Sequence, residues 1–413
     1  MTLERNSLRL GFIALNDCAP LVVAREKGFF EEEGLSVDLS REASWANVRD
    51  KVAMGALDGA HMLAPLPLAV NLGLSGEPRK MIAPLSLNLN GSAITVSRAL
   101  ADAMRAADPK AMAGRPRTAR ALAKVIAARR EAGEPPLVFA AVFPFSVHNY
   151  ELRYWMAQAG IDPDADVRLT AVPPPRMAAK LAAGDIDGFC VGAPWNALAV
   201  REGHGEILIF ASELWGVGPD KVFGLTQAWA ERSPATLRAA LRALIRAAAW
   251  SDVPDNRREL AAILAHPRYV AAPEEVVASS LLGALPGAPG EEHAAPDYII
   301  YHRYAASFPW RSHAVWFLTQ MLRWGQIPAA VDIAATAETT YRPDLYRAAA
   351  AELGLPAPVV DEKVEGLHGG SWTLDEATAP IPMGPDAFFD DRPFDAAQPH
   401  AYAAGFEITR YRP

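Results

Sequence analysis

Length, composition and charge place this chain among globular proteins with more than one lobe. The sequence has 413 residues, of which 51% are hydrophobic and 21% are charged, and this length exceeds the usual size of one compact core. The formal net charge of -8 at pH 7 argues against a broad surface for nucleic acid or anionic membrane, because both need concentrated Lys and Arg. No apolar run in the sequence is long enough to cross a bilayer.

The N-terminal segment carries no recognisable export signal. Its apolar stretch, residues 8–15, is short and is interrupted by an arginine and a glycine, unlike the core of a signal peptide. If Met1 is the native start, we expect a cytoplasmic protein, and a start trimmed from a longer protein is the alternative. The two cysteines, Cys18 and Cys190, agree with a fold that does not rely on disulfides.

An internal repeat organises the chain. Residues 51–65 read Lys-Val-Ala-Met-Gly-Ala-Leu-Asp-Gly-Ala-His-Met-Leu-Ala-Pro, and residues 180–194 read Lys-Leu-Ala-Ala-Gly-Asp-Ile-Asp-Gly-Phe-Cys-Val-Gly-Ala-Pro, with the same spacing of their shared residues. An apolar run typical of a strand precedes each copy, at residues 8–13 and 137–142. The repeat predicts two lobes built on one plan.

Each copy is expected to form strand, helix, strand, helix and strand. In the first copy, strands are predicted at 8–13, 35–39 and 60–63, with helices at 19–33 and from the N-cap Ser44 to Gly55. In the second copy, strands are predicted at 137–142, 167–172 and 188–191, with helices at 146–159 and 176–183. Strands that alternate with helices imply parallel sheets, and ligands bind at the edge where strands lead into helices.

The remaining segments connect and extend the lobes. Residues 98–130 read as interrupted surface helix, residues 221–229 as a return to the first lobe, and residues 233–249 as a strong helix. Amphipathic helical segments at 298–324 precede an end rich in Pro, Gly and Asp, which is expected to wrap as an extended tail. The predicted division is a first lobe of residues 1–92 and 218–300, a second lobe of residues 93–217, and a C-terminal region of residues 301–413 packed on the lobes.

The facing edges of the two lobes offer cradles for an anion, because free N–H groups and the positive dipole end lie where helices begin. Trp45 is either an N–H donor that also shields an oxyanion from water or a core tryptophan. His148 is either an anion donor or an ordinary satisfied histidine. Lys221 either supplies the counter-charge that a buried anion needs or is solvated in its turn. The segments expected to line the cleft are 44–45, 64–67, 88–92, 146–149 and 193–196.

Enzyme signatures are poor in this sequence. We find no Walker loop, dinucleotide fingerprint, nucleophile elbow or pair of histidines four residues apart, and the nine histidines are scattered. We therefore predict a binding protein rather than an enzyme, with no cofactor and no metal.

Six motifs carry a family resemblance that covers most of the chain. They read Gly-Phe-Ile-Ala-Leu-Asn-Asp-Cys-Ala-Pro at 11–20, Lys-Gly-Phe-Phe at 27–30, Ser-Trp-Ala-Asn-Val-Arg-Asp at 44–50, Asp-Gly-Ala-His-Met-Leu-Ala-Pro-Leu-Pro at 58–67, Leu-Asn-Gly at 89–91 and Ala-Pro-Trp-Asn at 193–196. Together they resemble the nitrate/bicarbonate-binding proteins of ABC transporters (NrtA/CmpA-like). The resemblance implies an α/β, periplasmic-binding-protein-like type II fold, in which two Rossmann-like lobes form a C-clamp with the anion in the cleft.

The resemblance also implies which residues hold the oxyanion. The positions that match the family pattern are Trp45, Ser92, His148 and Lys221. A lysine at the last position favours nitrate or nitrite, whereas a carboxylate there would suit bicarbonate, which can donate a proton. Ser92 departs from the longer amide expected in a nitrate receptor, and a water or Asn90 is the candidate to fill the gap. The full predicted ligand-binding set is Trp45, Asn90, Gly91, Ser92, His148, Pro194 and Lys221.

Without an export signal, the chain looks most like a cytoplasmic NasS-type nitrate/nitrite sensor. The resemblance implies that such a sensor, when ligand-free, sequesters an RNA-binding antiterminator of the NasT (ANTAR) type that controls nitrate-assimilation genes, and that the anion releases it. The sensor itself is expected to contact neither nucleic acid nor membrane. The alternative is the nitrate receptor of an ABC transporter with its signal peptide removed, and a remote alternative is an enzyme similar to those of thiamine-pyrimidine synthesis.

Overall fold

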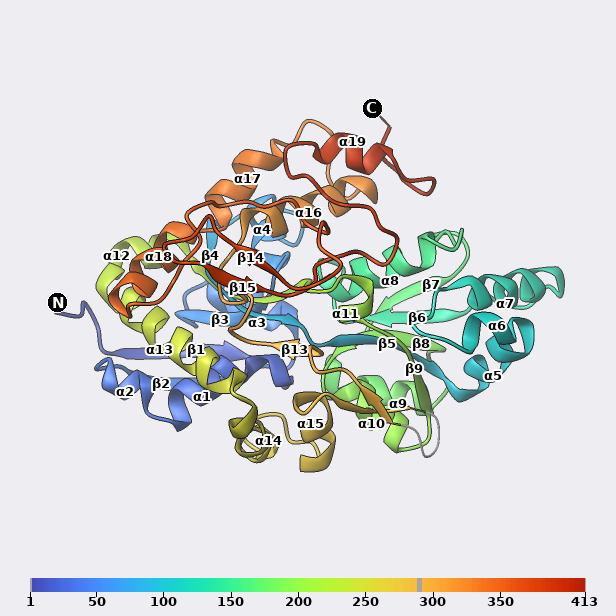
Figure 1. The fold of residues 1–413 in the computed structure, drawn as a ribbon, viewed down its shortest axis with the longest axis horizontal. Coiled ribbons are helices and arrows are strands. Elements are labelled where there is room, and N and C mark those ends of the chain that lie inside the picture. Colours follow the sequence, from blue (N-terminus) through green and yellow to red (C-terminus); the bar gives the residue numbers. More distant parts are fainter. Residues whose placement is uncertain (1, 288–291, 413) are drawn as a thin grey trace.

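The computed structural model describes residues 2–287 and 292–412. They form two lobes that lie side by side, each built around one β-sheet, with the C-terminal region extending across both (Figure 1). Among the described residues, none of the helices is both long and apolar enough to cross a membrane.

The first lobe contains a six-stranded sheet with the order β13-β4-β10-β3-β1-β2. Strand β1 pairs in parallel with β2 and β3, as the repeat predicts, whereas β10 runs antiparallel to both β3 and β4. The sheet is therefore mixed rather than parallel throughout, because β10 enters it from the second lobe. The strands are β1 (Ser7–Phe12), β2 (Ser36–Arg41), β3 (Gly59–Leu63), β4 (Met81–Asn90), β10 (Pro219–Thr226) and β13 (Ile299–Ile300).

Most helices of this lobe are short, and α13 is the exception with 19 residues. The helix predicted at 19–33 is divided into α1 and α2, because Gly28 between them takes a left-handed φ of 77°. The helices and turns of this lobe are η1 (Asn16–Cys18), α1 (Ala19–Glu26), α2 (Phe29–Glu32), α3 (Trp45–Ala53), α4 (Leu66–Asn71), α12 (Gln227–Arg232), α13 (Pro234–Asp252), η3 (Pro254–Asn256), α14 (Arg257–Ala265) and α15 (Glu274–Leu281). A small hairpin of β11 (Ala284–Pro286) and β12 (Glu292–Ala294) follows them.

The second lobe contains a five-stranded sheet with the order β7-β6-β8-β5-β9. Strand β6 is parallel to β7 and β8, again as predicted, and β5 is antiparallel to β8 and β9. The strands are β5 (Ser92–Ser97), β6 (Val138–Ala141), β7 (Arg168–Ala171), β8 (Gly188–Gly192) and β9 (Gly205–Phe210). The helices and turns are α5 (Arg98–Ala107), α6 (Pro109–Met112), α7 (Arg120–Glu131), α8 (Val147–Ala157), η2 (Pro174–Arg176), α9 (Met177–Ala182), α10 (Trp195–Arg201) and α11 (Ala211–Leu214).

The chain passes between the sheets at two connections. The first is Gly91, which joins β4 to β5 with a φ of 96°, and the second is the segment 211–218 between β9 and β10. Strand β5 belongs to the second sheet and pairs with β8 from Ser92 onward. The boundaries predicted at 92/93, 217/218 and 300/301 stay predictions.

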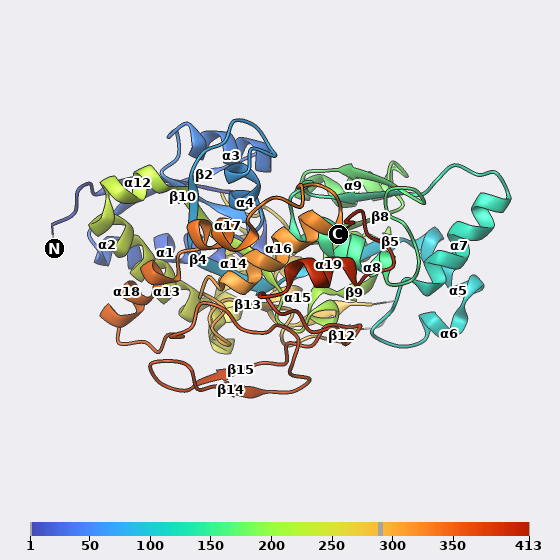
Figure 2. The same ribbon diagram turned by 90° about the horizontal axis from the view of Figure 1, so that it is seen from above.

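The C-terminal region contacts both lobes. The Tyr341 hydroxyl donates to the Ala64 carbonyl of the first lobe (3.0 Å), and the Tyr150 hydroxyl of the second lobe donates to Gln326 (2.8 Å). Figure 2 shows α17 and α18 over the first lobe and α19 beside α8 of the second. The region begins with α16 (Arg311–Arg323), within the predicted helical segment. The part after it contains more regular structure than the extended tail that we predicted: α17 (Ile333–Thr340), α18 (Pro343–Glu352), β14 (Trp372–Leu374), β15 (Ile381–Met383) and α19 (Pro399–Ala404). The helical segments predicted at 298–324 reduce to α16, because β13 occupies their beginning.

Substitution of Gly216 would test how tightly the C-terminal region packs against the second connection, residues 211–218. Its N–H donates to the Ala387 carbonyl (3.1 Å), and a Cβ at Gly216 would lie only 2.1 Å from the Pro385 carbonyl oxygen. Gly216→Ala should therefore lower the free energy of unfolding by about 1–3 kcal/mol through overpacking, measured by thermal or urea denaturation. Gly369→Ala is the matched control, because a Cβ there meets nothing within 4 Å. Equal stability of the two variants would contradict the tight packing.

Candidate functional site

The strand ends of the two lobes meet at a closed interface. The Asn16 N–H in η1 donates to the Ala193 carbonyl after β8 (2.9 Å), and the Trp195 indole N–H of α10 donates to the Ala14 carbonyl (3.0 Å). A Cβ on Gly192, at the end of β8, would lie 3.1 Å from Asp17 Oδ2 and 3.6 Å from His148 Nε2. The two lobes are therefore closed on each other at the predicted cleft, where the segments after β1 and β8 are in contact.

Lys221 lies at the centre of this interface and is fully buried. Its Nζ is 2.8 Å from Asp17 Oδ2 and 2.5 Å from Asp220 Oδ1. Asp17 also pairs with His61, whose Nε2 is 2.6 Å from Asp17 Oδ1. Two carboxylates of the chain itself therefore contact the lysine, and its role as the counter-charge of a bound anion stays a prediction.

Burial and these contacts set the protonation states. Burial acts to raise the pKa of Asp17, but Lys221 and His61 outweigh it and hold that pKa below its usual range. Burial raises the pKa of Asp220 to about 7, and the negative charge of Asp17 adds to the increase, although Lys221 opposes it. Burial acts to lower the pKa of Lys221, but Asp17 and Asp220 shift it upward overall. At neutral pH the lysine and Asp17 are charged, whereas Asp220 is close to its titration point.

Two hydrogen-bond donors face this charged centre. Trp45 begins α3, which Ser44 caps by accepting from the Asn47 N–H (3.2 Å). The Trp45 ring lies 5.8 Å from Lys221 Nζ and 5.3 Å from the His61 ring, and its N–H has no hydrogen-bond partner among the described residues. A buried, unpaired N–H is costly, so Trp45 is suited to donate to a ligand.

His148 is the second donor and comes from the other lobe. It lies in the first turn of α8, which Ser146 caps by accepting from the Asn149 N–H (3.1 Å). Its Nε2 is 3.8 Å from Asp220 Oδ1, and neither ring nitrogen has a hydrogen-bond partner within the described part of the chain. Burial, reinforced by the charge of Lys221, places the pKa of His148 well below its usual value, so the ring is neutral and offers one N–H.

Ser92 is near the centre but is bonded to a carboxyl group. Its hydroxyl donates to Glu151 Oε2 (2.7 Å), which also accepts from the Cys190 thiol (3.4 Å). Burial raises the pKa of Glu151, although both of these hydrogen bonds oppose the increase. Glu151 lies one helical turn after His148 on α8 and shares its face, so the gap next to Ser92 contains an acidic side chain and not the expected amide.

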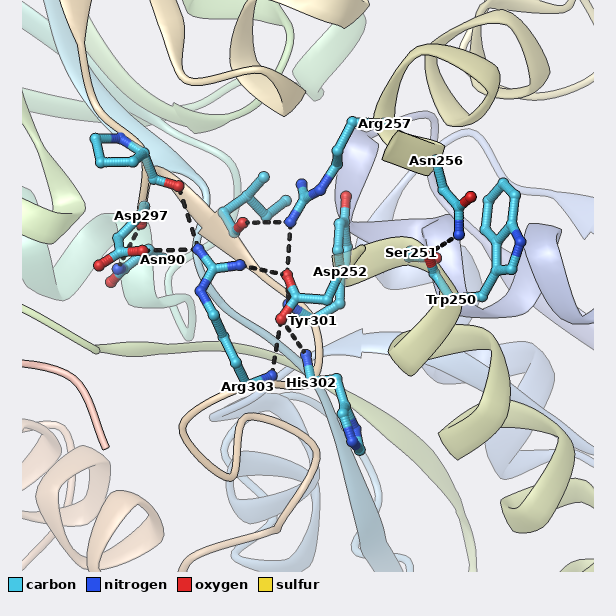
Figure 3. A network of polar contacts seen from close by, with 12 residues as sticks. Asn90, Trp250, Ser251, Asp252, Asn256, Arg257, Asp297, Tyr301, His302 and Arg303 are labelled. Atoms are coloured by element: carbon cyan, nitrogen blue, oxygen red, sulfur yellow. Dashed lines mark hydrogen bonds and ion pairs between the residues drawn. The ribbon is translucent and has the colours of Figure 1, made fainter. Parts of the chain in front are cut away.

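The Asn90 side chain is bonded within the connection between the lobes, and its predicted ligand contact stays a prediction. Its amide N–H groups donate to the carbonyls of Gly216 (2.8 Å) and Asp297 (3.0 Å), and its Oδ1 accepts from the Gly218 N–H (3.0 Å). Both amide hydrogens are therefore used before any ligand arrives. Figure 3 shows Asn90 beside Asp297, with the Arg303 guanidinium bridging Asp297 and Asp252 (2.7 Å to each).

Gly91 and Pro194 lie at the backbone of the interface. The Gly91 carbonyl accepts from the Ala193 N–H (2.8 Å), which links the first connection to the end of β8. Pro194 is buried immediately before α10. Ligand contact by these two residues, and by Trp45, Ser92, His148 and Lys221, stays a prediction.

Sequence reasoning missed the acidic half of the site. Asp17 lies within the motif at 11–20 and Asp220 directly precedes Lys221, but neither was named as a site residue, because a carboxylate is unexpected beside an anion. His61 lies inside the repeat at the position of Cys190 in the second copy, which is the middle of the equivalent strand in each lobe, β3 and β8. That equivalence was the available signal for His61.

Comparison with known proteins identifies the family. A profile of the NMT1-like family matches residues 1–265. The chain belongs to the NMT1-like family. It is 34% identical over 415 residues to the nitrate/nitrite binding protein NrtA of Synechococcus elongatus, covering 98% of this chain and 87% of that protein. The resemblance to the nitrate-binding proteins of ABC transporters is therefore confirmed, whereas the closer likeness to NasS-type sensors stays a prediction.

Two further relatives define the extent of the similarity. The chain is 38% identical over 357 residues to the nitrate import ATP-binding protein NrtC of Synechocystis sp., but it spans only about half of that relative (51%). The crystal structure of the periplasmic nitrate-binding protein NrtA from Synechocystis superimposes with a TM-score of 0.87 at 31% identity, covering 99% of this chain and 100% of the other. This confirms the predicted periplasmic-binding-protein-like fold of two α/β lobes.

The raised pKa of Asp220 predicts a pH-dependent contribution to stability. The folded carboxyl titrates near 7 and the unfolded one near its usual 3.8, so between about pH 4 and pH 7 the folded state holds a proton that the unfolded state has lost. This contribution is complete below about pH 4 and is lost as the pH rises through 7. Asp220→Asn removes the titration, so the melting temperature of the variant minus that of the wild type should increase from pH 4 to pH 7.

The exposed Asp38 provides the control. For Asp38→Asn the same difference should stay constant over this range. A constant difference for Asp220→Asn as well would contradict the raised pKa.

Proposed function

We propose that this chain binds nitrate or nitrite between its two lobes and serves as the receptor of an ABC-type transporter. The observation that carries the proposal is the buried Lys221 ammonium, with the unpaired N–H of Trp45 from one lobe and the neutral ring of His148 from the other at the same interface. One cation and two N–H donors suit a small oxyanion, whose charge would otherwise be desolvated without compensation. The names of the NrtA and NrtC relatives support nitrate as the anion and import as the process.

Lobe closure is the physical basis of such a receptor. The contacts Asn16 to Ala193 and Trp195 to Ala14 join the lobes around the site, so a ligand that interacts with both Trp45 and His148 favours the closed arrangement over an open one. Exclusion of water then strengthens the attraction between the anion and Lys221.

Lys221→Glu tests the proposal directly. Replacing the only buried cation at this centre among the described residues with a fourth carboxyl group should abolish nitrate binding, because an anion would then face uncompensated negative charge. Isothermal titration with nitrate, nitrite, bicarbonate and sulfate at millimolar concentrations measures the effect and the selectivity. Circular dichroism shows whether each variant is folded.

The exposed Lys110 of α6 is the matched control. Lys110→Glu makes the same charge change far from the interface and should leave the nitrate affinity unchanged. Nitrate affinity retained by folded Lys221→Glu would contradict the site, and no binding of nitrate or nitrite by the wild type would contradict the function.

The sensor function stays a second prediction, together with the cytoplasmic location that it requires. It demands that the ligand-free protein bind a NasT-type antiterminator and that nitrate weaken the complex, because ligand and partner prefer different lobe arrangements. If the chain is a sensor, gel filtration of the two purified proteins should show a complex without nitrate and none with nitrate. Absence of a complex, or a complex that nitrate does not weaken, would leave the transport receptor as the function.

A further inference from the structure

The interface contains more carboxyl groups than a site for an anion needs. Two carboxyl groups contact the Lys221 ammonium, Asp17 at 2.8 Å and Asp220 at 2.5 Å, and a third, Glu151, is close enough to interact electrostatically with Lys221 and Asp220. Asp17 and Asp220 are buried and Glu151 is half-buried, so solvent screens their mutual repulsion only weakly. A bound anion adds a further negative charge to this group.

The histidines do not compensate for that charge. Burial lowers the pKa of His61 and of His148, and Lys221 lowers both further. If Asp17 and Asp220 were both ionised, the site would carry a net charge of -1 before the anion arrived, with Glu151 neutral. Nitrate cannot bring a proton at neutral pH, so closure on it requires another source of positive charge.

Asp220 meets titratable or polar groups on every side. Asn88 of β4 donates to Asp220 Oδ2 at 3.4 Å, and His148 of α8 lies 3.8 Å from Oδ1. The other charged or titratable neighbours, from β10, η1, α8, β8 and the segment before β13, are Lys221, Asp17, Glu151, Cys190 and Tyr298. None of these neighbours except Lys221 is a cation at neutral pH.

We propose that the site binds its nitrate or nitrite ion together with one proton, and that the Asp220 carboxyl holds this proton. The proton comes from solvent and forms an O–H bond on Asp220, the ammonium of Lys221 turns from Asp220 to the anion, and no other bond changes. The inference rests on the proposed function, because it describes how the same site accepts its anion. Asp220 thereby acts as a specificity residue: once protonated, it offers an O–H donor to an ion that has none.

The contacts identify Asp220 as the proton acceptor among the three carboxyl groups. Asp17 is paired with both Lys221 and His61, which stabilises its charged form. Glu151 contacts no cation within hydrogen-bond distance in the described structure, and burial already favours its neutral form. Burial and the charge of Asp17 already hold the pKa of Asp220 above its usual range, so the approach of one more negative charge favours its protonation.

Isothermal titration of the full chain with sodium nitrate measures the proton directly. Titrations at one pH in Tris and in bicine, which differ in ionisation enthalpy, should give different observed enthalpies that correspond to uptake of about one proton per nitrate above pH 7. In the same range the Kd for nitrate should increase about tenfold per pH unit, because one proton is linked to binding. Equal enthalpies in both buffers together with a flat Kd would overturn the inference while leaving nitrate binding intact.

Variants assign the proton to a residue. Asp220→Asn, which resembles the protonated carboxyl, should bind nitrate without proton uptake and at least tenfold more tightly than the wild type at pH 8.5. The exposed Asp38→Asn should retain the wild-type pH dependence. Loss of the dependence in Glu151→Gln or His148→Gln, with its retention in Asp220→Asn, would overturn the assignment. A wild type that binds no nitrate refutes the proposed function instead.

Discussion

The buried ammonium of Lys221 is the charge on which the arrangement of the cleft depends. A lysine removed from water costs several kcal/mol unless opposite charge and hydrogen bonds replace the lost solvation. Asp17 and Asp220 supply that charge, and Asp17 does so from η1, the turn that follows β1. Because Asp17 is held to Lys221 and His61, η1 is fixed at the sheet edge, where the neighbouring Asn16 contacts the second lobe. The charge pair and the closure contact therefore depend on the same three-residue turn.

A second polar network connects this turn to the inter-lobe connections. Asp252, at the end of α13, accepts from Arg257 (2.6 Å) and Arg303 (2.7 Å) and from backbone N–H groups of residues 301–303 (Figure 3). Tyr301, which this network holds, donates its hydroxyl to the Asn16 carbonyl (2.8 Å). Asn90 joins the same network through Asp297. Tyr301 and its network thus link the connection at Gly91 to η1 through hydrogen bonds. A rotation of the lobes therefore affects both segments.

The repeat predicted the parallel core of each lobe because a strand-helix-strand unit is a local pattern. The N-cap predicted at Ser44 correctly placed Trp45 at the start of a helix, and the helix predicted from residue 146 placed His148 in its first turn. What the sequence did not predict depends on contacts between distant residues. The antiparallel entry of β10, the use of the Asn90 amide within the connection, and the Asp17–Lys221 pair all join segments more than 100 residues apart, and none leaves a periodic signal.

The environment of Lys221 changes what a lysine at this position means for selectivity. Taken alone, a cation favours a fully ionised anion such as nitrate, and a carboxylate favours an anion that can donate a proton. Here a cation and two carboxylates occupy one buried cluster, so the preference depends on which carboxyl groups are ionised when the lobes close. The short Ser92 side chain fits this interpretation, because its hydroxyl bonds to Glu151 and leaves the donors to Trp45, His148 and Lys221. Selectivity at such a site is a property of the charge balance of the whole cluster, and a single residue does not determine it.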